Sequence, residues 1–445
     1  MEYTEFDNGE NLIAAISTAA GVGGVAVIRV SGSGALSLAK KMFVPSGKRA
    51  VDCFEPYRMY TGKILCDGFA DFGMCVYFKA PKSFTGEDVV EFHCHGGAVV
   101  ARGVLSAACK AGARPAERGE FTKRAFVNGK LSLSSAEGMI DMINAESLAE
   151  VRAGGLLYAE KLTGEIKKIQ AQLTDMLAQI AADCDYPEEG IEETELGSVE
   201  QDLRAICDRV NALVAVYSGG KFIKSGVSVA ICGAPNVGKS SLLNALLGYD
   251  KAIVSPIAGT TRDAVEGTVQ IDGVKYNFTD TAGIRAEAGE IEAIGIERAK
   301  RALRTADIVV CVSDCGDFSA AADISDSRLV KVFSKTDEGE PSGEYDVAVS
   351  SVTGEGLDNL KKLIARKATG ASSLENAYVI EERHYLALKR SLEKLTCAAD
   401  GVKQFPLDLV SLDIREGWRI LGEITGETAD EEIINTVFAK FCVGK

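Results

Sequence analysis

The chain has 445 residues, a formal net charge of −15 at pH 7 and twelve cysteines. A length of this size predicts roughly two to four domains. No stretch reaches the roughly 18 uninterrupted apolar residues of a membrane span, and the acidic N-terminus lacks the basic and apolar regions of a secretory signal. The cysteines show no Cys-x-x-Cys pair and no zinc spacing. These features predict a cytoplasmic protein with reduced thiols and argue against a membrane-spanning or disulfide-stabilised one.

Charge is distributed unevenly along the chain. Residues 1–130 hold 16 basic and 13 acidic side chains, whereas the remaining residues hold 33 basic and 51 acidic ones. A protein that binds nucleic acid broadly needs a basic surface to neutralise phosphates. The composition therefore argues against such a protein, and we expect any RNA contact to be local or shared with a partner.

The first 130 residues predict an α/β or α+β domain of their own. Apolar runs at Val25–Val30, Met74–Phe78 and Val89–Phe92 predict strands, and glycine-rich turns separate them. His93 and His95 lie two residues apart at the end of the third strand. Without a second ligand cluster, a metal site is the less favoured interpretation of this pair.

Two separated regions of the chain carry helical periodicity. Residues 131–184 predict long helices without proline, and Leu203–Tyr217 predicts a further amphipathic helix. Later in the chain, Glu375–Val402 and Leu407–Leu421 continue the same pattern. The simplest interpretation is one helical region that is interrupted by an inserted domain.

The inserted region begins with a phosphate-binding loop. Residues Gly233–Ser240 match the pattern G-x-x-x-x-G-K-[ST], with a predicted strand before them at 226–232 and a predicted helix after them at Ser241–Leu247. In this setting the loop N–H groups and the helix N-terminus bind phosphates. Lys239 would then lie between the β- and γ-phosphates, and the Ser240 hydroxyl would ligate Mg²⁺. The pattern predicts a nucleotide-binding protein.

Later motifs follow in the order of a small GTPase. Gly259–Asp263 offers Thr261 as a further Mg²⁺ ligand. Asp280–Gly283 follows the strand-like run Tyr276–Thr279. The first residue of that motif would approach the metal, and the last would direct its N–H to the γ-phosphate.

The guanine base is the expected target of the next two motifs. Ser334–Asp337 follows the predicted strand Leu329–Phe333 and takes the place of the motif N-K-x-D. The Asp337 carboxylate would accept hydrogen bonds from the N1–H and N2–H₂ edge of guanine, which adenine lacks. Ser334 replaces the Asn of the motif, so one amide is missing and a lower guanine affinity is left open. With Ser350–Ser351 as the last base-contacting loop, we interpret the nucleotide as GTP.

The site lacks the glutamine that orients the attacking water in Ras-like GTPases, because Ile284 occupies that position. Hydrolysis then needs another residue for the water and another positive charge for the transition state. Asn236 and residues 255–260 suggest a monovalent cation that takes the place of an arginine finger. Glu292 is the candidate for the water, although on spacing alone a solvated surface charge is the more favoured interpretation.

Several segments across the chain form a recognisable set. They are residues 23–32, 84–97, 119–130, 257–263 and 289–298, together with the closing residues Phe441–Lys445. Together they resemble the MnmE family (also called TrmE or ThdF) of tRNA-modification GTPases, over nearly the whole chain. The chain departs from that family at Ala19 and Ala20, which replace a Pro-Pro pair, at Val22, which replaces a basic residue, and at Ser334.

This resemblance implies an α/β multidomain fold. Residues 1–127 would form an N-terminal α+β domain that binds tetrahydrofolate and dimerises. Residues 128–220 and 373–445 would form a discontinuous helical domain, and residues 221–372 an inserted Ras-like P-loop GTPase domain.

The resemblance further implies a homodimer that forms a heterotetramer with an MnmG-type partner, which carries FAD and uses NADH. The two proteins would add an aminomethyl or carboxymethylaminomethyl group to C5 of the wobble uridine of certain tRNAs. A tetrahydrofolate of the 5-formyl or 5,10-methylene type would supply the one-carbon unit. GTP hydrolysis would need Mg²⁺ and K⁺ and would accompany G-domain dimerisation.

Site residues follow from the resemblance position by position. Folate contacts fall on Arg29, Glu91, Lys130 and Lys445, and potassium contacts fall on Asn236, Ser255, Ile257 and Thr260. Glu292 becomes the catalytic residue, and Cys442 lies in the C-terminal motif, where a small buried role is equally open. The nucleotide contacts are Asn236, Val237, Gly238, Lys239, Ser240, Ser241, Ser255, Pro256, Ile257, Ala258, Gly259, Thr260, Thr261, Asp280, Thr281, Ala282, Gly283, Lys335, Asp337, Ser350 and Ser351, with Arg262 and Asp263 beside them.

An Era-like GTPase that binds ribosomal RNA is the alternative function, because it shares this kind of G domain. It predicts a basic RNA-binding module such as a KH domain, and the acidic composition argues against one. The sequence leaves open which tRNAs are modified, whether glycine or ammonium supplies the nitrogen, and how hydrolysis is coupled to the modification. We expect the partner to supply the base that acts on the uridine, because no activated nucleophile is evident in this chain.

Overall fold

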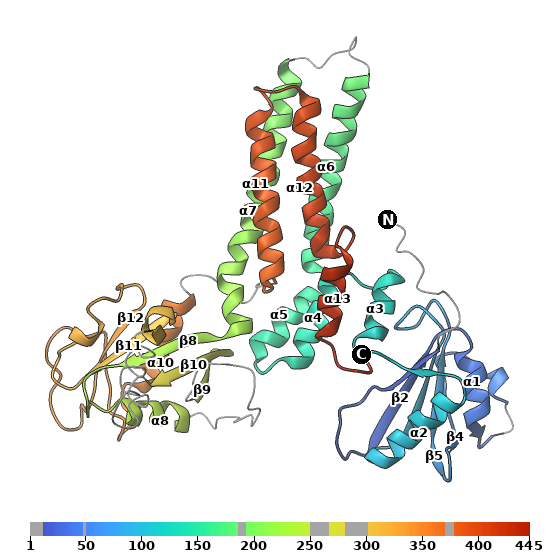
Figure 1. Cartoon of the computed structure of the whole chain (residues 1–445). Helices are drawn as coiled ribbons and strands as arrows, with labels where there is room; N and C mark the ends of the chain where they lie inside the picture. Colours follow the sequence, from blue (N-terminus) through green and yellow to red (C-terminus); the bar gives the residue numbers. More distant parts are fainter. Residues whose placement is uncertain (1–11, 48–49, 186–192, 250–266, 281–300, 370–377) are drawn as a thin grey trace, which may run out of the picture. The chain divides into compact units, whose positions relative to one another are not determined.

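The computed structural model of the chain describes residues 12–47, 50–185, 193–249, 267–280, 301–369 and 378–445. The packing of the backbone divides the chain into two compact units (Figure 1). Unit 1 contains Met1–Ile140, Leu157–Leu203 and Glu393–Lys445, and unit 2 contains Asp141–Leu156 and Arg204–Leu392. None of the helices in the described residues combines the length and the apolar character that a membrane span requires.

Unit 1 is built on a seven-stranded sheet with the order β3-β4-β5-β6-β2-β1-β7. Neighbouring strands are antiparallel, except that β1 and β7 are parallel. Because side chains alternate along a strand, β2 sends Ile28 and Val30 to one face and Arg29 to the other. The strands are β1 Ile13–Ile16, β2 Val25–Ser31, β3 Phe43–Pro45, β4 Met59–Leu65, β5 Ala70–Phe78, β6 Val89–His95 and β7 Arg114–Pro115, with a 3₁₀ helix at Val51–Cys53.

The two faces of this sheet are covered differently. An apolar core that includes Ile28 and Phe92 joins one face to α1 (Ala35–Met42) and α2 (Ala98–Lys110). On the opposite face, Phe121 of α3 (Glu120–Val127) packs against the outward side chains of β1. The face with Arg29 therefore has a helix over only part of its strands.

Exposed apolar side chains stand on the part of that face formed by β3, β4 and β5. Val44, Met59 and Phe72 are 49%, 50% and 65% exposed. They alternate with buried neighbours such as Ile64, so they point away from α1 and α2. We call these three residues the open sheet face. Apolar groups gathered on a surface are typical of an interface with another protein.

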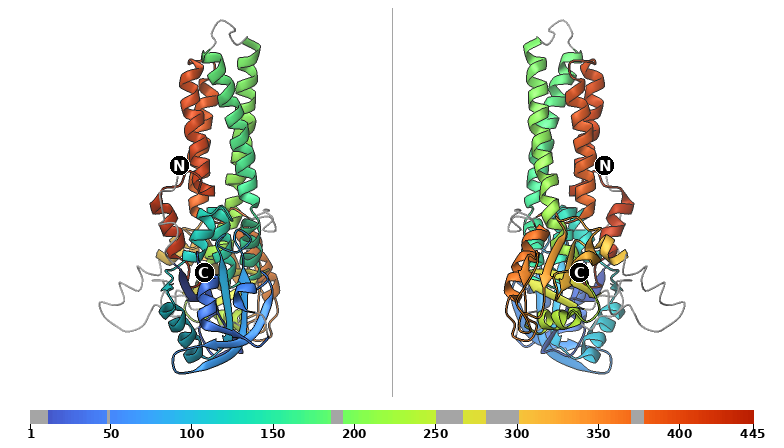
Figure 2. Two further views of the ribbon diagram at one scale, coloured as in Figure 1. Left: turned by 90° about the vertical axis from the view of Figure 1, so that its right-hand side faces the viewer. Right: turned by 90° about the vertical axis from the view of Figure 1, so that its left-hand side faces the viewer.

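The rest of unit 1 is helical. α6 (Lys161–Asp185) lies beside α12 (Leu407–Thr425) although a long stretch of sequence separates them (Figures 1 and 2). The Gln170 side chain of α6 donates to the Trp418 carbonyl of α12 at 3.2 Å. α13 (Glu431–Ala439) packs through aromatic side chains on the residues around α4. The buried stripe of α6 has helical spacing and consists of Leu162, Ile166, Ile169, Leu173, Met176 and Ile180.

Four helices contribute residues to both units. They are α4 (Leu133–Asn144), α5 (Leu148–Tyr158), α7 (Glu193–Ser225) and α11 (Glu382–Gly401). The helices predicted before and after the inserted region are thus observed. The pattern at residues 131–184 is divided among three helices, α4 to α6, and α7 begins before the predicted Leu203. The predicted start of the later helix at Glu375 lies outside the described residues, and residues 378–381 are not helical, so α11 begins at Glu382.

Unit 2 is built on a six-stranded sheet with the order β13-β12-β11-β8-β10-β9. All neighbouring strands are parallel except for the β9–β10 hairpin. Every residue of β11 is buried, as expected for a strand covered on both faces. The strands are β8 Val227–Cys232, β9 Gly267–Ile271, β10 Val274–Asp280, β11 Ile308–Ser313, β12 Leu329–Phe333 and β13 Val347–Ala348, and the helices are α8 Lys239–Tyr249 and α10 Leu357–Thr369, with a 3₁₀ helix at Ser319–Ala321.

The strand order of unit 2 predicts where a ligand binds. β8 lies between β10 and β11, so the order reverses beside it. In open parallel sheets, ligands bind beyond the carboxyl ends of the strands at this reversal. The phosphate-binding pattern follows β8 directly, at that end.

A cluster of three charged residues in unit 2 lies outside the nucleotide site. Lys224 Nζ, at the end of α7, is 2.7 Å from Asp141 Oδ1 and also contacts Glu381. Burial and the nearby Glu381 raise the pKa of Asp141 to about 7, although Lys224 acts in the opposite direction. One carboxyl of this cluster therefore titrates near neutral pH.

Candidate functional site

The loop between β8 and α8 has the backbone that a phosphate cradle requires. Gly233, Asn236 and Gly238 have φ values of 143°, 66° and 92°. A Cβ atom on Gly233 would lie 2.2 Å from the Val312 carbonyl oxygen, so only glycine fits there. Asparagine is one of the few other residues that adopt a left-handed conformation readily. The residues at these three positions are thus ones that can adopt the positive φ values that the loop requires.

Lys239 is held inside this loop. Its ammonium group donates to the Gly233 carbonyl at 3.1 Å and to the Ala234 carbonyl at 2.7 Å, and the residue is 7% exposed. Both acceptors are neutral, so a phosphate oxygen would be a stronger partner for this charge. Ser240 follows in the first turn of α8, where helix N–H groups face an anion. These residues fit a nucleotide phosphate with Mg²⁺.

Ser334 has a role that the sequence did not reveal. Its hydroxyl donates to the Val237 carbonyl at 2.7 Å, is 3.2 Å from the Ser313 carbonyl, and belongs to a residue that is 2% exposed. The serine therefore ties the phosphate loop to the ends of β11 and β12. Sequence reasoning treated this position only as a missing amide in the base pocket. Its place directly after a buried strand was the available signal.

The side chains that would read the base meet in one place. Lys335, with φ of 58°, lies 2.9 Å from Asp314, and that hydrogen bond raises the pKa of Lys335. The Ser350 hydroxyl donates to Asp337 Oδ1 at 2.6 Å. Ser350 Oγ also accepts hydrogen bonds from the backbone N–H groups of residues 352 and 353, so Ser350 links Asp337 to the last loop. Asp314, which follows β11, is the residue that sequence reasoning missed.

Most of the remaining nucleotide and potassium candidates lie in segments outside the described residues. Asp280 is the last residue of β10. Outside the described residues lie Ser255, Pro256, Ile257, Ala258, Gly259, Thr260, Thr261, Arg262, Asp263, Thr281, Ala282, Gly283, Ile284 and Glu292.

A second polar site lies on the sheet of unit 1. Arg29 and Glu91 are paired in register across β2 and β6, and Arg29 Nε is 2.8 Å from Glu91 Oε1. The guanidinium carbon lies 5.2 Å from the ring centre of Phe84 and 5.7 Å from that of Phe121. Burial raises the pKa of Glu91, but the hydrogen bond with His93 and the charge of Arg29 outweigh this and lower it. The carboxylate is therefore charged at neutral pH.

The loop that carries Phe84 joins this pair to Lys130. Lys130 Nζ donates to the Pro81 carbonyl at 2.9 Å. Glu87 accepts from Arg124 at 3.0 Å and from the Ser31 hydroxyl at 2.7 Å, which anchors the loop to α3 and β2. The loop is thus held over the same face of the sheet as Arg29.

The C-terminal residues reach the same region. Val443 pairs with Arg118, and a Cβ on Gly444 would lie 2.2 Å from the Ile16 carbonyl oxygen, next to β2 in the sheet. Lys445 is half-buried. Cys442 is exposed, so the interpretation of Cys442 as a small buried residue is wrong. The Ser17 hydroxyl oxygen is buried and has no hydrogen-bond partner among the described residues. A polar ligand in this region would satisfy it, which fits a group such as folate.

The two histidines beside this site have carboxylate neighbours. His93 Nε2 is 3.4 Å from Glu91, and His95 Nδ1 is 2.6 Å from Asp71. Cys94 between them points to the opposite, buried face. In the described part of the chain, no three His, Cys, Asp or Glu side chains are grouped as metal ligands.

Comparison with solved structures finds similar GTPase domains. The G domain of the T. maritima FeoB iron transporter is 29% identical, with 32% of this chain and 98% of that chain covered and a TM-score of 0.24. An Era variant of Aquifex aeolicus bound to GDP and aluminium fluoride is 28% identical, with 38% and 66% covered and a TM-score of 0.26.

Comparison with curated proteins covers nearly the whole chain. The tRNA modification GTPase MnmE of Carboxydothermus hydrogenoformans is 36% identical over 462 residues, which cover 98% of this chain and 100% of the relative. That of Natranaerobius thermophilus is 37% identical over 460 residues, with the same coverage.

Two family models match consecutive parts of the sequence. The one described as the GTP-binding protein TrmE N-terminus matches residues 12–130, which contain Arg29, Glu91 and Lys130. The one described as the MnmE helical domain matches residues 133–442, which contain the phosphate loop. With both sites inside matched regions and relatives aligned from end to end, the chain belongs to the MnmE family of tRNA modification GTPases.

Proposed function

We propose that this protein is a GTP-hydrolysing, tetrahydrofolate-binding subunit that acts on tRNA with an FAD-dependent MnmG-type partner. Together they would add a carboxymethylaminomethyl or aminomethyl group to C5 of the wobble uridine of certain tRNAs. One observation carries the proposal. A single chain of this family holds both a phosphate loop that contains Lys239 and a polar site around Arg29 and Glu91.

In the proposed hydrolysis, water attacks the γ-phosphorus of GTP, the bond to the β,γ-bridging oxygen breaks, and GDP and phosphate leave. Lys239 is already fixed by two carbonyls, so it offers a positioned charge to the phosphate oxygens. Ser240 and Thr261 would hold Mg²⁺, which neutralises charge on those oxygens. Asp337, fixed by Ser350, would select guanine.

Potassium and Glu292 complete the proposed catalytic machinery. Because Ile284 cannot orient water, Glu292 would position the attacking water instead. Asn236, whose left-handed backbone is part of the phosphate loop, would hold K⁺ together with Ser255, Ile257 and Thr260. The cation would supply the positive charge that an arginine finger supplies elsewhere.

Tetrahydrofolate would bind around Arg29 and Glu91. A pterin presents an amide-like edge with N–H donors, and the charged Glu91 carboxylate is an acceptor for them. Lys130 and Lys445 would meet the carboxylates of the glutamyl tail. The bound folate would supply the one-carbon unit of the modification.

We also propose a homodimer and the domain division of the family. The open sheet face on β3, β4 and β5 supports dimerisation through the N-terminal domain, since it leaves Phe72 65% exposed. The domains would be residues 1–127 for folate and dimerisation, 128–220 with 373–445 for the helical part, and 221–372 for the GTPase. The Era-like alternative is not favoured, because the matched family models cover the flanks as well as the GTPase region.

Steady-state GTP hydrolysis in potassium and in sodium buffer tests this proposal. We expect a large stimulation by potassium in the wild type, and we expect Asn236→Ala and Glu292→Ala each to abolish it. A matched control is Glu344→Ala, which changes a carboxylate that is 94% exposed in the same unit. Equal rates in the two salts would contradict the cation-assisted mechanism.

A further inference from the structure

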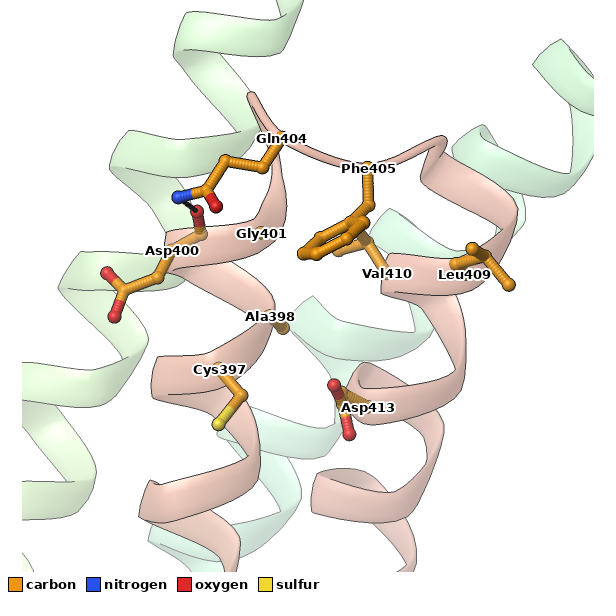
Figure 3. A pocket seen from close by; sticks show the side chains of 9 residues that line it. All are labelled: Cys397, Ala398, Asp400, Gly401, Gln404, Phe405, Leu409, Val410 and Asp413. Atoms are coloured by element: carbon orange, nitrogen blue, oxygen red, sulfur yellow. Dashed lines mark hydrogen bonds between the residues drawn. The ribbon is translucent and has the colours of Figure 1, made fainter.

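The turn between α11 and α12 encloses a groove that none of the proposed chemistry uses (Figure 3). Its volume is about 380 Å³, within the range of sites that accept a side chain cluster or a small ligand. The ring of Phe405 stands between the two helices. Gly401 lies on the α11 side of the groove, where a Cβ would make ordinary van der Waals contacts with Phe405 at 3.4 Å and with Val410 at 3.6 Å. We call this feature the α11–α12 groove.

Large apolar side chains are exposed along this groove and beside it. Phe405, Leu409 and Leu412 are 58%, 51% and 61% exposed. Leu409 and Leu412 are three residues apart on α12, so they lie on neighbouring positions of one helix surface. An apolar groove between two helices, bordered by such residues, is the shape that an amphipathic helix of another protein fills.

Charge around the groove is predominantly negative. Its charged lining residues are Asp400 and Asp413. Lys394 lies 3.1 Å from Asp413, in an exposed ion pair that offsets only part of the charge of that carboxylate, whereas Lys403 lies 2.6 Å from Glu200, which is not a lining residue. Residues 393–416 contain five acidic and three basic side chains. The surface therefore favours a partner with apolar side chains flanked by positive charges.

We infer that the α11–α12 groove is the docking site for a basic amphipathic helix of the FAD-dependent partner. This inference rests on the proposed function, which includes that partner. Apolar side chains of the helix enter between Phe405 and Leu409. Its lysines or arginines lay their aliphatic stems on the same surface and direct their charges to Asp400 and Asp413. The net charge of −15 on the whole chain would speed such an encounter.

The test measures the affinity of the purified FAD-loaded partner subunit for the full-length chain. We expect Leu409→Asp to weaken binding at least about ten-fold, because it places a charge in the apolar contact. The matched control is Leu386→Asp, which changes a leucine with the same 51% exposure on α11 outside the groove lining. We expect Asp413→Asn to weaken binding about two- to five-fold and to reduce its dependence on salt. Circular dichroism and thermal unfolding of each variant show that its helices are folded.

The exposed thiol of Cys397 provides a second measurement on the unaltered protein. Cys397 lines the groove, whereas Cys53 and Cys315 are exposed elsewhere. We expect the partner subunit to slow the reaction of Cys397 with iodoacetamide and to leave the other two rates unchanged. Mass spectrometry of the alkylated peptides reports all three in one sample.

The outcomes separate this inference from the proposed function. Binding of the partner by the wild type and equally by Leu409→Asp, with Cys397 still reactive, would overturn the docking site and leave the proposed function intact. Absence of binding by the wild type would overturn both. A change in the oligomeric state of the free chain in Leu409→Asp would assign the groove to a contact between copies, which also overturns the inference.

Discussion

The buried cations of the phosphate loop in unit 2 and of the Arg29 site in unit 1 have different kinds of hydrogen-bond partner. Among the described residues, the hydrogen-bond partners of Lys239 are two neutral carbonyls of its own loop, at 2.7 and 3.1 Å. Arg29 instead is bonded to a carboxylate, Glu91, across two strands. The first arrangement leaves a positive charge for an anionic ligand. The second is neutral as a pair, so it suits an uncharged group that hydrogen-bonds at its edge.

The same contrast applies to the surroundings of each site. The hydrogen bonds of Ser334 and Ser350 hold loops at the ends of parallel strands. The bonds of Glu87 and Lys130 hold one long loop over an antiparallel sheet. Substitutions in unit 2 should therefore change catalysis first, whereas substitutions in unit 1 should change stability as well as binding.

The largest effect is expected from the substitution of Lys239. Lys239→Ala removes the positioned charge, and we expect GTP hydrolysis to fall at least about a hundred-fold. The measurement is steady-state phosphate release at saturating GTP, together with the affinity for a fluorescent GDP. Binding of tetrahydrofolate serves as the control, because the change lies in unit 2. Hydrolysis within a few-fold of the wild type would remove Lys239 from the catalytic site.

Arg29→Ala should have the next largest effect, and mainly on stability. It leaves the Glu91 carboxylate, whose side chain is 14% exposed, without its guanidinium partner. We expect a loss of about 2–4 kcal/mol in the free energy of unfolding, together with loss of folate binding. Chemical denaturation monitored on unit 1 peptides by hydrogen exchange measures it. The double variant Arg29→Ala with Glu91→Gln should recover part of the stability but not the binding, and failure to recover would show that the pair is not coupled.

The nucleotide site could be predicted from the sequence because its parts follow strand ends. The predicted strands at 226–232 and Leu329–Phe333 are confirmed as β8 and β12. The carboxyl ends of parallel strands meet at one edge, so residues after them come together. The helix after the loop begins at Lys239, two residues before the predicted Ser241. The prediction missed this start because the first turn of the helix has no apolar periodicity. Asp314 was missed although it follows β11 in the same way.

The site of unit 1 could not be assembled from spacing. The strands Val25–Val30, Met74–Phe78 and Val89–Phe92 are confirmed in longer form, but the pairing of Arg29 with Glu91 depends on the register of β2 against β6. Register between strands far apart in sequence is set by packing across the whole sheet. Only the family resemblance named these residues together with Lys130 and Lys445.

Two carboxyls should give the units opposite responses to pH. The pKa of Glu91 is lowered by folding, so its contribution to stability is present above its unfolded pKa and is lost as pH falls through the folded pKa. The pKa of Asp141 is raised to about 7, so its contribution is present at low pH and is lost as pH rises through about 7.

Asp141→Asn isolates the second response. Between about pH 5 and pH 8, we expect the free energy of unfolding of the wild type to fall by on the order of 2 kcal/mol relative to that of Asp141→Asn, because the buried carboxyl ionises beside Glu381. Urea denaturation at the two pH values, followed on unit 2, measures the difference. Identical pH dependence in the two proteins would show that Asp141 does not titrate in this range.

Ser334 gives the smallest expected effect and the sharpest distinction within the nucleotide site. Ser334→Ala removes the hydroxyl that donates to the Val237 carbonyl. We therefore expect the free energy of unfolding to fall by about 1 kcal/mol and the affinity for GDP to be about five-fold weaker. Because the hydroxyl bonds to the phosphate loop, the preference for GDP over ADP should stay unchanged. Asp337→Asn, in contrast, should reduce that preference, since we propose that Asp337 accepts hydrogen bonds from the guanine base. Nucleotide titrations of both variants decide the matter: a changed preference in Ser334→Ala would mean that Ser334 reads the base and that the tether to Val237 is not its main role.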